Sequence, residues 1–462
     1  MEVPDQLPEG WKWSQIRDVI LDAQAGFSSG QKDVPGGIPH LRMNNITSEC
    51  TLDLSEVRTV PPELAKARHY LRPDDVLVCH TNSVKLVGKT ALYDATDGER
   101  AFSNHLTRLR VKPDAIHPQW LWRGLTVLWR DRYFETRCKK WVNQATIERN
   151  VLLAAPIALP PLPEQRRIVE KIERLLEQSR TAREALDHIP PLLKRVRQAV
   201  LAKAYRGELT ERDPNDEPAE RLLSAPAGKQ LTKKRVGRLW GSGVVPGLNA
   251  GERVSLPGTW VWAKVKDLGE HPEDTVQVGP MSMRSKDLGV TGVPVLNVGC
   301  IQWGHIDERK LGFMPDSLAG AFKRYQVKAG DVMFTRSGTV GRSAVVQPWQ
   351  EGWLMTFHLL RVRVSPAKCL PEYLQLAFQG ARHIHRQTTD ASIGTTRAGF
   401  NTNLLAMLDV PLAPLGEQRR IVAKVEALFA QADAIEQAGV RARRRAEQVD
   451  QAVLARAFRG EL

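Results

Sequence analysis

Residues 164–178, EQRRIVEKIERLLEQ, return 253 positions later as residues 417–431, EQRRIVAKVEALFAQ, with ten of fifteen positions identical. At the same offset, QAVLAKAYRGEL (198–209) returns as QAVLARAFRGEL (451–462), with ten of twelve positions identical. The chain therefore contains a long tandem repeat. A repeat determines the domain organisation and has to be settled before any local pattern is interpreted.

The two copies also share their beginnings. LPEGWKW at 7–13 resembles LPGTWVW at 256–262, so each unit is about 200 residues long. Between the ends the copies barely agree, apart from IPHL (38–41) with VPVL (293–296) and DVL (75–77) with DVM (331–333). The sequence thus predicts two similar scaffolds that carry different surfaces.

The composition is typical of a multidomain protein without export or membrane signals. With 462 residues, 42% of them hydrophobic, the chain is long enough for three or four compact regions of about 100 to 150 residues. The N-terminus lacks a charged start followed by an apolar stretch, and no run of about 18 apolar residues occurs. The five cysteines lie far apart, without the spacing of a zinc site. We therefore expect a cytoplasmic protein with reduced thiols and no metal.

The formal net charge of +14 favours polyanionic partners, because neutralising phosphates releases condensed counterions. Nucleic acid is the leading partner class. The same charge also fits a basic protein whose Lys and Arg are simply solvated. Charge alone does not decide between the two.

Each copy predicts a long helix that starts after a proline-rich segment, at 159–163 and at 410–415. Proline is tolerated at a helix start but prevents helix upstream, and Glu164 and Glu417 place negative charge near the positive end of the helix dipole. Glycine closes both helical regions, at Gly207 and Gly460, where a left-handed C-terminal cap would place it.

Apolar residues in these helices recur at alternating spacings of four and three, the period of a coiled-coil seam. The seam comprises Ile168, Ile172, Leu175, Ser179, Ala182, Leu186, Ile189, Leu193, Val196 and Val200 in one copy, and Ile421, Val425, Leu428, Ala432, Ile435, Ala446, Val449 and Val453 in the other. Pro190-Pro191 predicts a kink or break in the first helix. We expect the two helices to pack on each other within one chain; the alternative is a dimer or trimer formed through them.

The variable parts contain short apolar runs broken by Gly, Asn and Asp, with helical patches at 118–123 and 370–375. This pattern predicts an α+β fold. The prolines, glycines and basic cluster of 210–254 predict a mobile linker between the copies.

Paired variable domains that open with Leu-Pro-x-x-Trp-x-Trp, the segment GDVMFTRSG (330–338) and the repeated Glu-Gln-Arg-Arg-Ile-Val resemble the DNA-specificity subunit of type I restriction-modification enzymes. The resemblance covers nearly the whole chain. It implies two α/β target-recognition domains, each reading one half of a split, asymmetric DNA site, and conserved helices that pair as an antiparallel coiled coil. The expected boundaries are 1–158 and 255–410 for the recognition domains, 159–209 and 411–462 for the helical spacer regions, and 210–254 for the linker.

The resemblance further implies a non-catalytic chain that binds no cofactor itself. Its expected partners are double-stranded DNA, two adenine-N6 methyltransferase subunits that use S-adenosylmethionine, and, where a nuclease is present, restriction-translocase subunits that use ATP with Mg. In agreement, the sequence lacks an Asn-Pro-Pro-Phe/Tyr-like motif for a flipped adenine and a glycine-rich cofactor loop. A spacer helix of about 25 residues would span about 38 Å, on the order of 11 base pairs.

Loops rich in Arg, Lys, Asn and Gln are the candidate reading surfaces, because Arg and Lys suit guanine and Asn and Gln suit adenine in the major groove. The candidates are Arg42, Asn44, Asn45, His80, Asn82, Lys85, Lys89, Lys140, Asn143 and Gln144 in the first copy, and Asn297, Gln302, Arg336, Ser337, Thr339, Arg342, Thr396 and Arg397 in the second. Each can equally be a solvated or turn-stabilising side chain, so the prediction concerns the loops. Arg336 and Arg342 are preferred because they flank a turn that can bring backbone amides near phosphate.

Two other residue groups carry open interpretations. Trp11, Trp13, Trp260 and Trp262 are interpreted as core anchors, because they recur identically whereas reading residues should differ. The cluster Arg441, Arg443, Arg444 and Arg445 fits a DNA-facing surface and a solvated helix face equally well. The alternatives to a recognition subunit are a stand-alone bivalent DNA-binding regulator and a coiled-coil interaction scaffold; the scaffold predicts little salt dependence of nucleic-acid binding.

Overall fold

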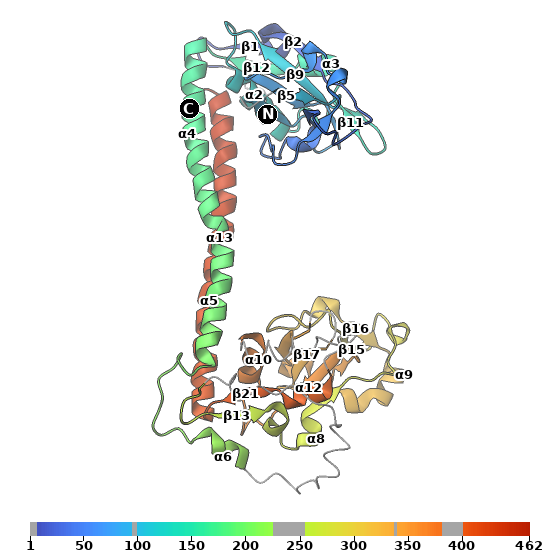
Figure 1. The fold of residues 1–462 in the computed structure, drawn as a ribbon, viewed down its shortest axis with the longest axis vertical. Coiled ribbons are helices and arrows are strands. Elements are labelled where there is room, and N and C mark those ends of the chain that lie inside the picture. The colour runs from blue at the N-terminus through green and yellow to red at the C-terminus, as the bar shows by residue number, and fades with distance from the viewer. Residues whose placement is uncertain (1–6, 95–98, 225–254, 337–339, 381–400) are drawn as a thin grey trace. The chain divides into compact units, whose positions relative to one another are not determined.

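The computed structural model describes residues 7–94, 99–224, 255–336, 340–380 and 401–462. The chain divides into two compact units: unit 1 comprises Met1–Asp187 and Gly439–Leu462, and unit 2 comprises His188–Ala438 (Figure 1). Each unit thus combines one variable part with segments of the long helices. Among the described helices, none is long and apolar enough to cross a membrane.

Unit 1 is organised around a four-stranded antiparallel sheet. Its strand order is β2 (Ile20–Ala25), β9 (Leu106–Val111), β5 (Asp75–Cys79) and β7 (Thr90–Tyr93). Helix α2 (Pro118–Arg130) packs against β5 and β7. Val76 and Val78 of β5 face the core that contains α2, whereas Leu77 and Cys79 face a second core. Residues 76–79 of this strand are therefore all apolar because both of its faces are buried.

Smaller sheets complete unit 1. One has the order β4 (Arg58–Val60), β3 (Ile38–Leu41) and β8 (Ala101–Phe102), with β3 and β8 parallel. A second has the order β10 (Lys139–Lys140), β11 (Ala145–Thr146) and β6 (Thr81–Asn82). Strand β1 (Lys12–Gln15) pairs with β12 (Pro156–Leu159), and the short helices are α1 (Ile16–Val19) and α3 (Arg149–Leu153).

Unit 2 repeats three of the four sheets of unit 1, and its described residues form no counterpart of the sheet of β10, β11 and β6. Its main sheet has the order β14 (Val276–Val278), β20 (Leu359–Val362), β17 (Val332–Thr335) and β18 (Ser343–Val345). The second sheet has the order β16 (Gly312–Met314), β15 (Val293–Leu296) and β19 (Leu354–Met355), again with a parallel pair. Strand β13 (Val261–Lys264) pairs with β21 (Asp409–Leu412), and the helices are α8 (Pro272–Thr275), α9 (Asp316–Ala319), α10 (Pro371–Gly380) and α12 (Thr402–Met407). The predicted pair of similar α+β scaffolds is confirmed.

The short match between DVL and DVM has a structural cause. A carboxylate oxygen of Asp75 accepts a hydrogen bond from the Arg72 backbone N–H at 2.8 Å, and the carboxylate pairs with Arg110. Asp331 makes the same contacts with the Lys328 N–H, at 2.7 Å, and with Arg363. Both aspartates are 1% exposed. Each therefore joins the turn before the central strand to the neighbouring strand, a function that both copies need.

The long helices are α4 (Leu162–Asp187), α5 (Ile189–Ala204) and α13 (Leu415–Phe458). The predicted break is confirmed: α4 ends before His188, and the two prolines occupy the first turn of α5, where their missing N–H groups cost nothing. In unit 1, Arg183 pairs with Asp450 and Asp187 with Arg443, so α4 and α13 run antiparallel. In unit 2, Arg197 of α5 pairs with Asp433 and Glu436 of α13.

The predicted seam is buried at only some of its positions. Ile168, Ile172, Ile421 and Val425 are buried because the sheet domain of their own unit also covers them. Other predicted seam residues are exposed: Ala182, Val196, Ile435 and Val449. The heptad spacing was wrong about the burial of these four residues, because a pair of helices covers only a narrow stripe of each surface.

The end of each repeat packs into the core of the opposite unit: the end of the second repeat lies in unit 1, and the end of the first repeat lies in unit 2. In unit 1, the Phe458 ring at the end of α13 stacks on Trp120 of α2, with centroids 4.1 Å apart. In unit 2, the Tyr205 hydroxyl, just past α5, donates to the Tyr373 carbonyl of α10 at 2.6 Å. Gly207 and Gly460 follow with φ of +70° and +73°, which confirms the predicted left-handed caps.

The predicted linker begins with a packed segment. Asp216 pairs with Arg420 at 2.5 Å, and helix α6 (Ala219–Ser224) places Ala219 in the core of unit 2. Residues 225–254 lie outside the described part of the chain. Of the four repeated tryptophans, Trp11 and Trp260 are core anchors as predicted, Trp262 is half-buried, and Trp13 is 37% exposed.

Candidate nucleic-acid interface

Unit 1 has a polar groove of about 330 Å³ beside the sheet that contains β3. Four chain segments form it: the loop after β2, the end of β3 with the turn that follows, strand β4, and the loop between β8 and β9. Its lining residues are Ser28, Ser29, Gln31, Lys32, His40, Arg42, Met43, Asn44, Arg58, Val60, Ser103, Asn104 and His105. The groove therefore combines cationic side chains with the amides that suit base edges.

His40 forms the floor of the groove. It is 4% exposed, and its ring lies 4.8 Å from the Phe27 ring. Burial lowers the pKa of His40 below its ordinary value, so the imidazole is neutral near pH 7. Among the described residues, the His40 Nε2 and the neighbouring Arg42 Nε have no hydrogen-bond partner. Two buried nitrogens thus border a groove that already contains Asn44 and Arg58.

The hairpin of β10 and β11 continues from this groove. The backbone N–H groups of His80 and Thr81 both donate to the His105 carbonyl, at 3.1 and 3.3 Å. Strand β6, which starts at Thr81, in turn pairs with β11. His105 also lines the groove. The hairpin around residue 140 is thus linked, through β6 and the His105 carbonyl, to a residue that lines the groove.

The structure separates the predicted residues of unit 1 into two groups. Arg42 and Asn44 line the groove, His80 and Asn82 are half-buried beside it, and the remaining exposed candidates are Lys85, Lys140, Asn143 and Gln144.

The second group, Asn45 and Lys89, has internal roles. Asn45 is 4% exposed, and its amide donates to the carbonyls of Asp53 and Glu56. Lys89 is 6% exposed and donates to the Ile46 carbonyl. Because a base contact requires an accessible side chain, we do not propose these two as reading residues.

In unit 2, two of the predicted residues lie together. An Arg342 guanidinium nitrogen lies 3.4 Å from the Gln302 side-chain oxygen. Arg336 lies over the Phe357 ring, 4.4 Å from its centroid, and burial lowers the pKa of this arginine. The Asn297 side chain closes its own turn, through the Gly299 N–H and the Lys310 carbonyl. Ser337, Thr339, Thr396 and Arg397 lie outside the described residues.

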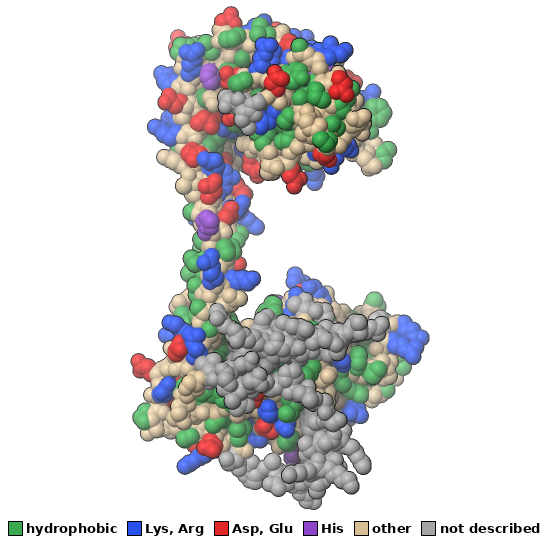
Figure 2. Space-filling model, in the orientation of Figure 1, with side chains coloured by type: hydrophobic (Ala, Val, Ile, Leu, Met, Phe, Trp, Pro, Cys, Tyr) green, Lys and Arg blue, Asp and Glu red, His purple; other side chains and the backbone are tan. Residues whose placement is uncertain are grey.

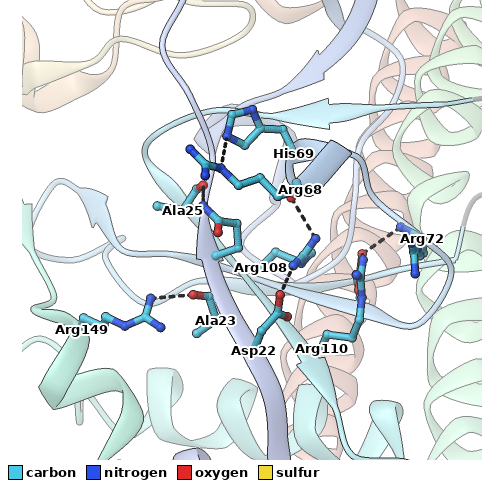
Figure 3. Close-up of polar contacts among 11 residues, drawn as sticks. Asp22, Ala23, Ala25, Arg68, His69, Arg72, Arg108, Arg110 and Arg149 are labelled. Atoms are coloured by element: carbon cyan, nitrogen blue, oxygen red, sulfur yellow. Dashed lines mark hydrogen bonds and ion pairs between the residues drawn. The ribbon is translucent and has the colours of Figure 1, made fainter. Parts of the chain in front are cut away.

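Several arginines of unit 1 maintain the fold. Figure 3 shows Arg108 turned toward the Asp22 carboxylate and the Arg68 carbonyl, and Arg149 turned toward the Ala23 carbonyl. Arg108 is 1% exposed. On the face of unit 1 that Figure 2 shows, basic side chains alternate with acidic ones. The net charge is therefore a poor guide to the interface, and the loop positions are a better one.

Sequence reasoning missed the groove residues outside its chosen loops, notably Gln31, Lys32, Arg58 and Asn104. No spacing joins these positions, which come from separate segments. Their only sequence signal was polar composition in loops. Among the described residues there is no cluster of His, Cys, Asp and Glu that could hold a metal ion.

Acid is expected to destabilise unit 1. Burial lowers the pKa of His40, His69, His80 and His117, that of His80 from 6.5 to about 4. The unfolded chain therefore binds more protons between about pH 6.5 and 4, and stability falls as the pH falls through this window. Melting curves at pH 7 and 5 test this, and His80→Asn should reduce the difference. An equal melting temperature at both pH values would contradict the expectation.

Two copies of one scaffold, with unlike polar loops and with paired helices, define a two-domain recognition protein for DNA. Residues 8–189 and 257–442 match the family described as "Type I restriction modification DNA specificity domain". The chain belongs to this family of specificity subunits, the non-catalytic part of type I restriction-modification enzymes that recognises DNA target sites.

Individual relatives resemble the chain over nearly its full length. The EcoKI specificity subunit of Escherichia coli K12 is 27% identical, and the StySPI specificity subunit of Salmonella potsdam is 28% identical; both alignments cover 99% of this chain and 90% of the relative. A chain from a solved type I restriction-modification system superimposes with a TM-score of 0.70 at 19% identity, covering 99% of this chain and 100% of that one. The HsdS subunit from Thermoanaerobacter tengcongensis gives 0.59 at 18% identity, with full coverage of both chains. These similarities confirm the fold class.

Proposed function

We propose that the chain reads a split, asymmetric DNA site, one half-site per unit, and positions adenine-N6 methyltransferase subunits on it. The proposal takes double-stranded DNA and two methyltransferase subunits as partners, with restriction-translocase subunits as a further possibility. S-adenosylmethionine, and ATP with Mg, belong to those partners in this proposal.

The observation that carries the proposal is the pair of equivalent loops with unlike side chains. The Ser103 N–H donates to the Leu41 carbonyl, and the Thr356 N–H donates to the Leu296 carbonyl. Each bond lies within one unit. It joins the end of β3 to the residue after β8 in unit 1, and the end of β15 to the residue after β19 in unit 2. The residue after Leu41 is Arg42, whereas the residue after Leu296 is Asn297.

The loop after the second strand of each pair also differs, here between a polar and an aromatic side chain. Asn104 of unit 1 corresponds to Phe357 of unit 2, which supports Arg336. A shared backbone with different donors and acceptors fits two readers of different sequences, because base identity is read by side chains in the groove. We therefore propose unlike half-sites and a non-palindromic target.

The test is genome-wide mapping of N6-methyladenine in cells that express the chain with its methyltransferase, compared with the methyltransferase alone. A split, asymmetric motif that appears only with the chain supports the proposal and reports both half-sites. A palindromic motif, or the same motif without the chain, would overturn it. Specific binding without methylation would favour a stand-alone DNA-binding regulator.

Helix length is expected to set the distance between the half-sites. Arg197 of α5 faces Asp433 of α13, so four residues inserted into each helix at this place lengthen the pair by about 6 Å, close to two base pairs. Methylation mapping should then report a spacer longer by about two base pairs, with both half-sites unchanged. A changed half-site sequence would refute this role, and substitutions at the same positions without insertion serve as the control.

A further inference from the structure

The hairpin of β10 and β11 has an unusual tip. Lys139 and Lys140 pair with Thr146 and Ala145, and the Trp141 N–H donates to the Gln144 carbonyl at 2.7 Å. Only Val142 and Asn143 remain to form the turn. The tip is therefore a tight reversal whose backbone is held by its own hydrogen bonds.

Two large apolar side chains point away from the protein at this tip. Trp141 is 61% exposed and Val142 is 99% exposed. β-Branched residues are uncommon at tight turns, where Gly, Asn and Asp dominate. A tryptophan ring that remains exposed to water gives no hydrophobic stabilisation. An apolar pair at this position stabilises neither the turn nor a core, which indicates a contact outside the chain.

The surroundings of the tip are cationic. The Lys139 ammonium lies 5.2 Å from the centroid of the Trp141 ring. Trp141 directly follows β10, and this cation–π contact places both side chains on the same side of the hairpin. No carboxylate of the described residues forms an ion pair with Lys139 or Lys140. Two exposed positive charges thus precede the apolar tip on β10, where they can contact a phosphate backbone.

The tip also belongs to the proposed reading surface. Strand β11 pairs with β6, whose first residue shares the His105 carbonyl with His80. His105 lines the polar groove of unit 1. The hairpin is thus joined through β6 and His105 to the groove that we propose binds DNA.

We propose that Trp141 and Val142 form a wedge that inserts against the base stack of the half-site read by unit 1, with Lys139 and Lys140 on the flanking phosphates. The inference rests on the proposed function. Proteins that bend DNA insert apolar side chains between base steps and regain the cost of unstacking through further contacts. Aromatic rings also stack on bases with little dependence on sequence.

Size and charge favour DNA over a protein partner. A stable protein interface buries about 800 Å² on each partner, from some 20 to 30 residues. The apolar part of this tip comprises two residues, and its neighbours are lysines, which are depleted in the cores of protein interfaces. A narrow, cationic, aromatic projection therefore fits a groove of DNA better than the surface of a subunit.

The experiment uses the full chain in complex with its methyltransferase subunits and a duplex that contains the mapped motif. Trp141→Ala is expected to weaken binding by about 5- to 150-fold, the loss that corresponds to one stacked base. Trp141→Phe should recover most of the binding. Trp349→Ala is the matched control, because Trp349 is also an exposed tryptophan, 66% accessible, but bonds to Glu308 of its own unit.

A second readout separates a wedge from a general loss of affinity. 2-Aminopurine is placed beside, not at, the methylated adenine of each half-site, and its fluorescence should rise on binding at one half-site only. Trp141→Ala should remove this rise and leave the salt dependence unchanged, whereas Lys140→Gln should reduce the salt slope by about one ion.

The outcomes are distinct. The wedge is overturned if the unaltered chain produces no rise in fluorescence, or if the rise persists in Trp141→Ala. In both cases the proposed recognition function still stands. Weaker assembly with the methyltransferase in Trp141→Ala would also overturn the wedge, because the tip would then contact a protein. Failure of the unaltered chain to bind the motif specifically would instead remove the proposed function.

Discussion

Replacing Phe458 with alanine is expected to destabilise unit 1 by about 3 to 5 kcal/mol, the usual cost of deleting a buried phenylalanine ring. Phe458 is 4% exposed and stacks on Trp120 in the core. A Cβ atom at Gly124 of α2 would lie 3.0 Å from the Phe458 ring and 2.9 Å from the Ile157 side chain, so the absence of a side chain at Gly124 leaves the space that these two residues fill. The substitution would leave a cavity between α2 and the end of α13.

The substitution should abolish methylation of the split motif, although its direct effect is confined to packing in the core of unit 1. Folding stabilities of about 5 to 15 kcal/mol leave little reserve against such a loss, so methylation of the split motif should disappear although the groove of unit 1 is untouched. Denaturant unfolding and methylation mapping measure the two effects. Val449→Ala, on the same helix at 52% exposure, is the control and should change stability by no more than about 0.5 kcal/mol. Equal stability of both variants would contradict the packing described for Phe458.

Replacing Gln165 or Gln418 with alanine is expected to cost about 3 kcal/mol or more in the corresponding unit, because each buried hydrogen-bonding group left unsatisfied costs about 1 to 3 kcal/mol. Gln165 accepts from the His117 N–H and donates to the carbonyls of Ala115 and Pro160. Both glutamines are completely buried.

Gln418 repeats these contacts in unit 2. It accepts from the Leu370 N–H and donates to the carbonyls of Lys368 and Ala413. The glutamine of the repeated EQRR segment therefore joins the start of each long helix to the loop before α2 or α10. Loss of this joint should loosen the sheet domain from the helix in either unit.

Three variants distinguish the hydrogen bonds from packing. Gln165→Glu preserves the size of the side chain but removes its two donors, so it should lose nearly as much stability as Gln165→Ala. Gln178→Ala, at an exposed position of the same helix, should be close to neutral. Hydrogen exchange in α2 would report the local effect, and unchanged protection in Gln165→Ala would show that the joint contributes little.

Residues that are identical in the two sequence copies make the same structural contacts in both units. Asp75 and Asp331, and likewise Gln165 and Gln418, make corresponding contacts in the two units. Phe458 and Tyr205 differ by a hydroxyl, and their rings contact the Trp120 and Tyr373 rings. All of them connect elements within a unit. The residues that differ, such as Arg42 and Asn297, lie where the scaffold presents loops. Selection for a common fold and for different surfaces would produce this division.

The sequence by itself determined the features that depend on neighbouring residues. The repeat, the helix starts after proline, the break at Pro190-Pro191, the caps at Gly207 and Gly460 and the α+β class all follow from local conformational preferences. The family also follows from motifs that are contiguous in the chain.

Only the tertiary structure decided which side chains are accessible and which segments meet. Lys89 and Asn45 are residue types that read bases but are buried, whereas Arg58 of β4 and Asn104 of the loop after β8 reach the groove from separate segments. Phe458 lies far along the chain from Trp120 yet packs on it. Burial depends on contacts between residues remote in sequence, and no pattern within a few turns of helix or strand specifies those contacts.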